Sequence, residues 1–183
     1  MKTISGKVLK LLGWKITGDV SYLSKSVIIF APHTSYYDAV YGKLFLNEIG
    51  INHIFLSKKE LFFFPMNIIL KWYGSVSVQK GHKNTINQIV DIINTSQSTH
   101  IVLSPEGTRK KAIKWNKGFY YMALKSKVPI VVGFIDFKKK EVGIKSVIYD
   151  IEDYSSVMHK INLMYNDIQG KCPENFTLDK RFS

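Results

Sequence analysis

The chain contains little cysteine, little proline and few acidic residues. Of its 183 residues, one is cysteine, five are proline and 14 are acidic, against 26 lysines and arginines. The single Cys172 excludes an intramolecular disulfide framework and fits a reducing compartment. The formal net charge of +12 indicates an anionic partner. Phosphate-bearing small molecules, anionic lipid and nucleic acid are the candidates.

Long apolar runs are also missing. No run reaches the roughly 18 residues that a membrane-spanning helix needs, so we expect no transmembrane span. Lys7, Lys10 and Lys15 interrupt the apolar core that a secretory signal would require near the start of the chain. We therefore expect no such signal.

Residues 1–15 have the pattern of an amphipathic helix. The apolar positions recur at helical spacing and are flanked by lysines: Ile4, Val8, Leu11 and Leu12, with Lys2, Lys7 and Lys10 beside them and Trp14 at the end. Such a helix can lie in a membrane interface, with its basic residues near lipid headgroups. Alternatively, it packs its apolar stripe on the protein's own core.

The rest of the chain alternates between predicted strands and helices. Apolar, β-branched runs predict strands at Val27–Phe30, His53–Ser57, Ser75–Gln79, His100–Leu103, Ile130–Ile135 and Val142–Tyr149. Helical stretches are predicted at Tyr36–Asn47, Met66–Tyr73, Thr85–Asn94, Gly118–Lys125 and Tyr154–Ile168. Lys138–Lys140 has the character of a hairpin tip. The pattern predicts one α/β domain over residues 1–183, a sandwich with a central, mostly parallel (mixed) sheet flanked by helices.

His33 lies between the first of these strands and the helix that follows. Pro32 disfavours a helical backbone at Ala31, so we expect a turn there, with Ser35 capping the helix and Asp38 at its third position. The turn can fold back so that Asp38 contacts the His33 ring, which fixes the tautomer and leaves the other ring nitrogen free to take a proton. The pair is a candidate general base. Alternatively, Asp38 only caps the helix and His33 is an ordinary loop residue.

A second candidate loop, Ser104–Arg109, follows the strand His100–Leu103. Sites in α/β sheets lie beyond the carboxyl ends of the strands, where this loop and His33 are both expected. Gly107 permits a tight backbone path, and Arg109 offers a planar fork for phosphate. Four lysines follow and add positive charge: Lys110, Lys111, Lys114 and Lys117. The alternatives are an ordinary surface turn and a solvated charged face.

Together, the two loops resemble the glycerolipid acyltransferase family, whose type member is 1-acylglycerol-3-phosphate acyltransferase. His33 and Asp38 match its H-x-x-x-x-D motif, and Ser104–Arg109 is similar to its F-P-E-G-T-R block, with Ser104 in place of the usual aromatic residue. Other features of the family are resembled by Lys58–Leu61 with Pro65 and Gly74, by Lys117–Phe119 and by Val128–Ile130. The agreement covers about residues 27–132, which is the catalytic core of the family.

The resemblance implies transfer of a fatty acyl group from acyl-CoA or acyl carrier protein to the hydroxyl of a lysophospholipid-like acceptor. It makes His33 the general base, oriented by Asp38, and requires no metal and no other cofactor. The implied substrate-binding residues are Glu106, Gly107, Thr108, Arg109, Lys58 and Lys80. Lys80 stands where the family usually has an arginine, which leaves open whether the acceptor is 1-acylglycerol 3-phosphate or another single-chain lipid, such as an aminolipid.

An apolar stretch that includes three consecutive phenylalanines, Phe62, Phe63 and Phe64, lies between the two loops in sequence. We expect these three side chains to contact the acyl chain or the membrane. The alternative is a core helix, although Pro65 argues against one continuous helix. With the basic charge, this pattern predicts a cytoplasmic protein that is peripheral on the inner face of the membrane, with an anionic membrane surface as partner.

Two other classes of protein fit parts of the sequence. A nucleic-acid-binding protein would explain the basic charge and the aromatic residues, but no reader motif is present, and no nucleic acid is expected as partner. A lipid-binding scaffold without catalysis would keep the fold, but it does not explain the intact pair of His33 and Asp38.

Overall fold

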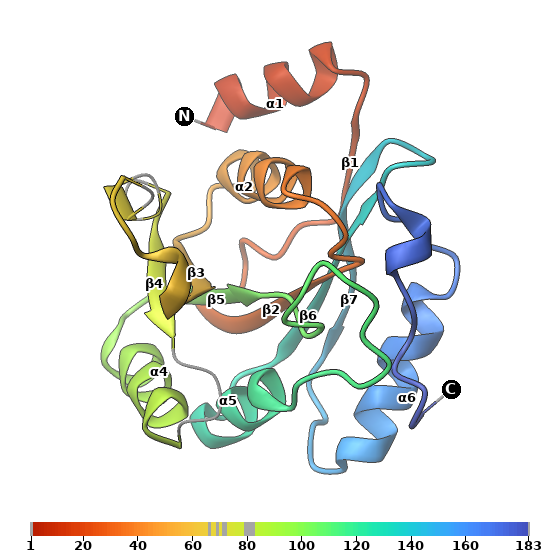
Figure 1. The fold of residues 1–183 in the computed structure, drawn as a ribbon. Coiled ribbons are helices and arrows are strands. Elements are labelled where there is room, and N and C mark those ends of the chain that lie inside the picture. Colours follow the sequence, from red (N-terminus) through yellow and green to blue (C-terminus); the bar gives the residue numbers. More distant parts are fainter. Residues whose placement is uncertain (1, 66, 69, 71–72, 79–82, 183) are drawn as a thin grey trace.

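One mixed sheet organises the molecule (Figure 1). The computed structural model describes residues 2–65, 67–68, 70, 73–78 and 83–182. In this part of the chain, seven strands are hydrogen-bonded in the order β1-β7-β6-β2-β5-β3-β4. Their bounds are β1 Lys15–Thr17, β2 Lys25–Ala31, β3 His53–Lys58, β4 Ser75–Val78, β5 Thr99–Leu103, β6 Ile130–Asp136 and β7 Glu141–Ile148. The hairpin formed by β6 and β7 is antiparallel, and the other neighbouring pairs are parallel.

Helices cover the two faces of this sheet. Their bounds are α1 Lys2–Leu11, α2 Tyr37–Ile49, α4 Lys83–Thr95, α5 Gly118–Ser126 and α6 Tyr154–Tyr165, with short 3-10 turns η1 Lys59–Leu61 and η2 Pro173–Asn175. In Figure 1, α2 lies on one face with α1 stacked outside it, whereas α4, α5 and α6 lie on the other face. Together with the sheet order, this arrangement confirms the predicted α/β sandwich.

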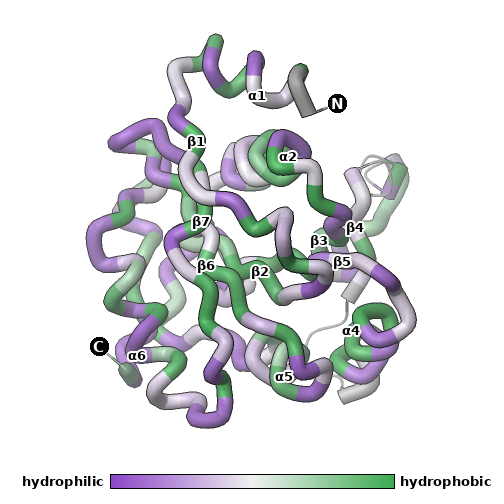
Figure 2. Tube along the Cα trace, turned by 180° about the vertical axis from the view of Figure 1, so that it is seen from behind, coloured by the Kyte–Doolittle hydropathy of each residue, from purple (hydrophilic) through white to green (hydrophobic). Residues whose placement is uncertain are grey.

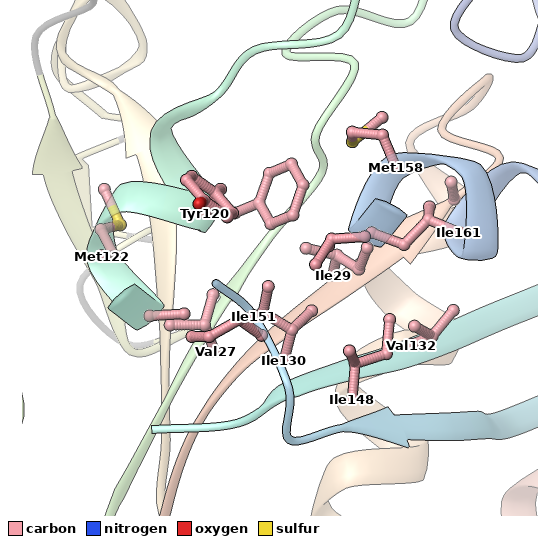
Figure 3. Packing of buried hydrophobic residues seen from close by; sticks show 14 of the residues in the cluster. Val27, Ile29, Tyr120, Met122, Ile130, Val132, Ile148, Ile151, Met158 and Ile161 are labelled. Atoms are coloured by element: carbon pink, nitrogen blue, oxygen red, sulfur yellow. The ribbon is translucent and has the colours of Figure 1, made fainter. Parts of the chain in front are cut away.

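The core has two layers because the side chains of a strand point alternately to opposite faces of the sheet. On β2, Val27 and Ile29 pack on the side of α5 and α6, while Ile28 and Phe30 pack on the side of α2. Figure 3 shows the first layer, in which residues of β2, β6 and β7 meet α5 and α6. Figure 2 shows the hydrophobic residues concentrated along the central strands. β2 is buried on both faces, as expected of a central parallel strand.

The strands predicted from the sequence occur with small shifts of their ends, and Phe137–Lys140 form the tip of the hairpin between β6 and β7. β1 was not predicted, because it has three residues and all are exposed, so no hydrophobic alternation marks it. The predicted helix at residues 154–168 is too long: it ends at Tyr165, and a turn in which the Ile168 N–H bonds the Tyr165 carbonyl buries Ile168. Of the predicted helix at residues 66–73, Asn67, Ile68 and Leu70 are helical.

The N-terminal helix packs with a face different from the one that its apolar spacing predicts. Ser5 and Leu9 are buried, and Gly6 approaches α2 closely enough for its N–H to bond Oε2 of Glu48 at 2.8 Å. The predicted stripe instead points outward, with Ile4 66%, Leu11 88% and Leu12 46% exposed. The alternative of packing on the protein's own core therefore does not hold for Ile4, Leu11 and Leu12, whereas Val8 is partly buried and Trp14, after the helix, lies in the core.

Candidate active site

The register of the sheet brings the two candidate loops to the same edge. β2 and β5 are parallel neighbours, with Ile29 opposite Leu103. Because both strands run on for similar distances before they turn, the loop at His33 and the loop at Gly107 leave the sheet side by side. The carboxyl ends of adjacent parallel strands are where α/β proteins usually hold their ligands. The strand register thus joins two motifs that are about seventy residues apart in the sequence.

Asp38 contacts both the His33 ring and the backbone of the turn. Its Oδ2 lies 3.1 Å from Nδ1 of His33, and it accepts hydrogen bonds from the N–H groups of Thr34 at 2.7 Å and Ser35 at 2.8 Å. The Asp38 side chain is 4% exposed, whereas the His33 side chain is 29% exposed. Asp38 therefore orders the turn and also contacts Nδ1 of the imidazole, and a proton on Nδ1 leaves Nε2 as an acceptor.

The first turn of α2 differs in detail from the prediction. Tyr36, not Ser35, occupies the N-cap position, and it makes no side-chain cap. Ser35 Oγ accepts a hydrogen bond from the N–H of Tyr37 at 3.2 Å. The boundary moves by one residue because Asp38, in the first turn of the helix, bonds the amides that precede it.

Glu106 joins the two loops through the backbone of His33. Its Oε1 accepts a hydrogen bond from the His33 N–H at 2.7 Å, and the residue is 3% exposed. Burial raises the pKa of Glu106 to about 8; the hydrogen bond from His33 opposes this effect, and the charge of Asp38 adds to it. Glu106 thus fixes the position of the His33 backbone, and its raised pKa favours the neutral carboxyl at pH 7.

Gly107 is required by the path of the second loop. It has a φ of +63°, and a Cβ there would lie 2.4 Å from Nδ2 of Asn116. That amide donates to the carbonyl oxygens of Pro105 and Glu106, both at 3.2 Å, and these hydrogen bonds stabilise the backbone of the loop. The sequence reasoning identified Gly107 but missed Asn116, since its role depends on a contact across ten residues that no spacing reveals.

Arg109 and Thr108 complete the edge of the site. The guanidinium carbon of Arg109 lies over the ring of Tyr36, 3.4 Å from its centroid. The hydroxyl oxygen of Thr108 accepts a hydrogen bond from the N–H of Lys110 at 3.2 Å, which leaves its own proton available to a ligand. Four of the predicted substrate-binding residues, at positions 106–109, therefore lie on the loop that meets His33.

The other predicted site residues lie around β3. Lys58 is its last residue; its side chain and the whole of Lys80 lie outside the described residues. Phe62 is partly buried, but Phe63 and Phe64 are 58% and 79% exposed in the turn after η1. Phe63 and Phe64 therefore do not belong to a core helix.

The comparisons with known proteins agree with this geometry. The family model described as Acyltransferase matches residues 14–134. The chain belongs to the Acyltransferase family. The matched segment contains both loops of the site, from His33 to Arg109. No protein in a search of curated proteins matched this acyltransferase.

The fold of the acyltransferase resembles a solved enzyme. The crystal structure of the 1-acyl-sn-glycerophosphate (LPA) acyltransferase PlsC from Thermotoga maritima superposes with a TM-score of 0.59. The match covers 91% of this chain and 74% of that chain, at 15% sequence identity. At this identity the likeness shows a shared architecture of sheet and helices.

A C-terminal segment, residues 166–182, contacts the turn after His33 and the stretch before α5. The Cys172 N–H donates to Thr34 Oγ1 at 3.1 Å, next to His33 in the sequence. Further along, the carboxylate of the fully buried Asp179 accepts from the Trp115 N–H at 2.9 Å and binds Arg181. The sequence predicted no structure after Ile168, because the buried polar contacts of this segment have no helical or strand periodicity.

The described residues contain neither a metal-ligand cluster nor a membrane-spanning helix. No three side chains of His, Cys, Asp and Glu gather closely enough there to hold a metal ion together. In the same part of the chain, no helix has the length and apolar character needed to cross a membrane.

Proposed function

We propose that this acyltransferase moves a fatty acyl group from an acyl thioester, acyl-CoA or acyl carrier protein, to the hydroxyl of a 1-acylglycerol-3-phosphate-like acceptor. The observation that carries the proposal is the contact of His33 Nδ1 with Asp38 Oδ2, at the edge where the 106–109 loop leaves the sheet. The same contacts would serve an acceptor that is another single-chain lipid, so the acceptor panel described below includes an aminolipid.

His33 is the proposed general base. A hydroxyl is a weak nucleophile until its proton is removed as it attacks, and an imidazole whose Nδ1–H is bonded to a carboxylate can accept that proton on Nε2. Asp38 then stabilises the imidazolium that forms, and Oδ2 is within 3.1 Å of the ring for this purpose. The partial exposure of the His33 side chain gives the acceptor access to Nε2.

The proposed transfer is direct and needs no cofactor. The acceptor oxygen forms a bond to the thioester carbonyl carbon while its proton passes to His33, and a tetrahedral oxyanion results. When the oxyanion collapses, the carbon–sulfur bond breaks and the imidazolium returns the proton to the leaving thiolate. Backbone N–H groups of the 104–109 loop are our candidates for stabilising the oxyanion, because those of His33, Thr34 and Ser35 already bond Glu106 and Asp38.

Arg109 and Thr108 form the proposed headgroup site. Arginine presents a planar set of N–H donors that match two phosphate oxygens, and a threonine hydroxyl can donate a third hydrogen bond. Glu106 is buried in the same loop. Because its pKa is raised to about 8, its carboxyl is mainly neutral at pH 7. A buried neutral carboxyl avoids repelling an anionic headgroup, which an ionised one would do.

We also propose that the enzyme works as a peripheral protein on an anionic membrane surface, such as the inner face of a cytoplasmic membrane. The exposed Phe63 and Phe64, and Leu11 on the outer side of α1, offer apolar groups to the interface. The excess of lysine and arginine, +12 overall, favours anionic lipid.

The catalytic proposal is tested with the purified chain, palmitoyl-CoA or palmitoyl acyl carrier protein, and a panel of acceptors analysed by mass spectrometry. The panel is 1-acylglycerol 3-phosphate, lysophosphatidylethanolamine, monoacylglycerol and a single-chain aminolipid. We expect acyl product, with 1-acylglycerol 3-phosphate preferred, and a loss of at least about 100-fold in His33→Ala. A folded His33→Ala that retains turnover removes the proposed base.

The membrane proposal is tested by flotation with phosphatidylglycerol and phosphatidylcholine vesicles at increasing salt. We expect binding to the acidic vesicles that weakens as salt rises, because exposed charges are screened. Phe63→Ser/Phe64→Ser should weaken it further, whereas Leu163→Ser, an exposed apolar residue on α6, should not. Binding that is equal for neutral and acidic vesicles contradicts the electrostatic part of the proposal.

A further inference from the structure

The aromatic ring of Tyr36 does not pack in the hydrophobic core. The residue is 73% exposed, in the position just before α2, so its ring adds little to the core. Its described contact is the guanidinium of Arg109, whose central carbon lies 3.4 Å from the ring centroid. Tyr36 follows His33 by three residues, and Arg109 comes from the other loop of the site. The stack therefore spans the two loops at the edge of the site.

Stacking orders the arginine without using its hydrogen-bond donors. The N–H groups of a guanidinium point outward in its plane, so a ring against one face restricts the plane and leaves the donors free. In the part of the chain that the structure describes, no backbone or side-chain atom accepts a hydrogen bond from Arg109. An ordered guanidinium with unused donors is a pre-organised site for an oxyanion that accepts two hydrogen bonds.

The charge around this stack favours an anion over an amine. Glu106, the acidic residue of the same loop, is buried and has its pKa raised to about 8, and Asp38 is buried against the turn. The cations Lys110 and Lys111 follow Arg109 and are exposed. An ammonium headgroup would meet positive charge here, whereas a phosphate monoester would meet an ordered fork of donors.

From the Tyr36–Arg109 stack we infer that Tyr36 is a positioning residue, which orients Arg109 to bind the phosphate of the acceptor. This inference deepens the proposed function and rests on it. It implies that the acceptor is a lysolipid with a phosphate group and not a neutral glyceride or an aminolipid. The hydroxyl of Tyr36 has no part in it, because the ring alone makes the stack.

The kinetic test compares Tyr36→Ala, Tyr36→Phe and Tyr149→Ala, a control at a tyrosine that is 64% exposed just beyond the end of β7. For Tyr36→Ala we expect KM for 1-acylglycerol 3-phosphate to rise about three- to tenfold, with kcat and KM for the acyl donor unchanged within about twofold. Tyr36→Phe should restore the low KM, and Tyr149→Ala should match the wild type.

A double-mutant cycle shows whether Tyr36 acts through Arg109. In the Arg109→Ala background, Tyr36→Ala should change the acceptor KM by less than about twofold. An unchanged acceptor KM in Tyr36→Ala, a fall in kcat instead, an equal loss with monoacylglycerol, or full additivity in the cycle overturns the inference. A rise in the donor KM alone assigns the stack to the donor's phosphate and also overturns it.

A binding measurement separates this inference from the proposed function. Equilibrium binding of 1-acylglycerol 3-phosphate is measured by calorimetry without acyl donor, so no turnover is needed. A three- to tenfold weaker Kd in Tyr36→Ala, restored in Tyr36→Phe, supports the stack as a phosphate site even if the wild type forms no acyl product. Equal Kd values for wild type and Tyr36→Ala contradict it, whether or not the wild type is active.

Discussion

The carboxyl group of Glu106 accepts a hydrogen bond from the backbone N–H of His33, with 2.7 Å between N and Oε1. A buried residue of the second loop therefore fixes the backbone of the residue proposed as the base. Tyr36 and Arg109 form a second contact between the same two loops, on the exposed side. One contact is buried and polar and the other is exposed and aromatic, so changes at the two should have separable effects.

Glu106 should make the stability of the protein depend on pH. Its pKa is raised from 4.5 in the unfolded chain to about 8, so unfolding releases its proton between these values, and its stabilising contribution is lost as pH rises through about 8. Glu106→Gln keeps an oxygen that can accept from His33 but does not titrate. We expect urea unfolding to show the wild type losing roughly 2–4 kcal/mol more than Glu106→Gln between pH 5 and pH 9.

Parallel curves for the two proteins over this pH range would contradict the raised pKa. The histidines and surface carboxylates are the same in both, so their titration cancels in the comparison. Activity offers a second readout: Glu106→Ala, which leaves the His33 N–H without its acceptor, should lose more activity than Glu106→Gln.

Asp38→Asn should keep the fold and lose turnover. The amide oxygen can still accept from the N–H groups of Thr34 and Ser35, but it carries no charge to stabilise an imidazolium at His33. We expect kcat to fall by about 10²- to 10⁴-fold while the thermal midpoint changes little. Circular dichroism melts and acyl-transfer rates measure the two quantities. A large loss of stability with normal turnover would instead assign Asp38 to capping alone.

Gly107→Ala should damage the second loop. Alanine disfavours the positive φ, and its Cβ would meet the Asn116 amide at 2.4 Å. We expect about 1–3 kcal/mol lower stability in urea and a raised acceptor KM. Gly118→Ala is the matched control, since the nearest atom to its Cβ is Met122 Cε at 3.9 Å.

Removal of the obstructing amide refines this prediction. Gly107→Ala/Asn116→Ala should recover the part of the loss that comes from the clash and keep the part that comes from φ. Urea midpoints of the single and double variants give the coupling between the two residues. If the two losses simply add, the contact between residues 107 and 116 has no energetic consequence.

Asp179→Asn should loosen the C-terminal segment and the loop before α5. The buried carboxylate binds Arg181 and the Trp115 N–H, and these hydrogen bonds lower its pKa although burial opposes them. We expect a loss of about 1–3 kcal/mol and a reduced rate of acyl transfer. Asp167→Asn, whose side chain is 54% exposed and paired with lysines, should change stability by less than about 0.5 kcal/mol. Urea unfolding compares the two variants.

The sequence predicted what local chemistry determines. β2 and β5 are apolar runs, and each leads into a loop with its own motif, so the fold class and the meeting of His33 with Asp38 followed from patterns within a few residues. The meeting of the loop at His33 with the loop at Gly107 followed from a general rule about parallel sheets. Packing then set the ends of the elements, as at α6.

What the sequence did not predict depends on distant partners. The stack of Tyr36 on Arg109 requires two loops to be at a known separation, and the buried Asp179 is paired with Trp115 and Arg181, of which Trp115 is 64 residues away in the sequence. The spacing of apolar residues did not predict that α1 packs through the face of Ser5 and Leu9, because it does not reveal the close approach to α2 that Gly6 permits. In each case the residue types are visible in the sequence, but their partners are not.

The segment at residues 166–182 has a consequence for synthesis of the enzyme. A nascent chain that has emerged as far as α6 already contains every strand of the described sheet and both proposed catalytic residues. It still lacks Cys172, which bonds Thr34, and Asp179, which bonds Trp115. Acyl transfer should therefore begin only after residues 172–182 have emerged, because they bond Thr34 and Trp115.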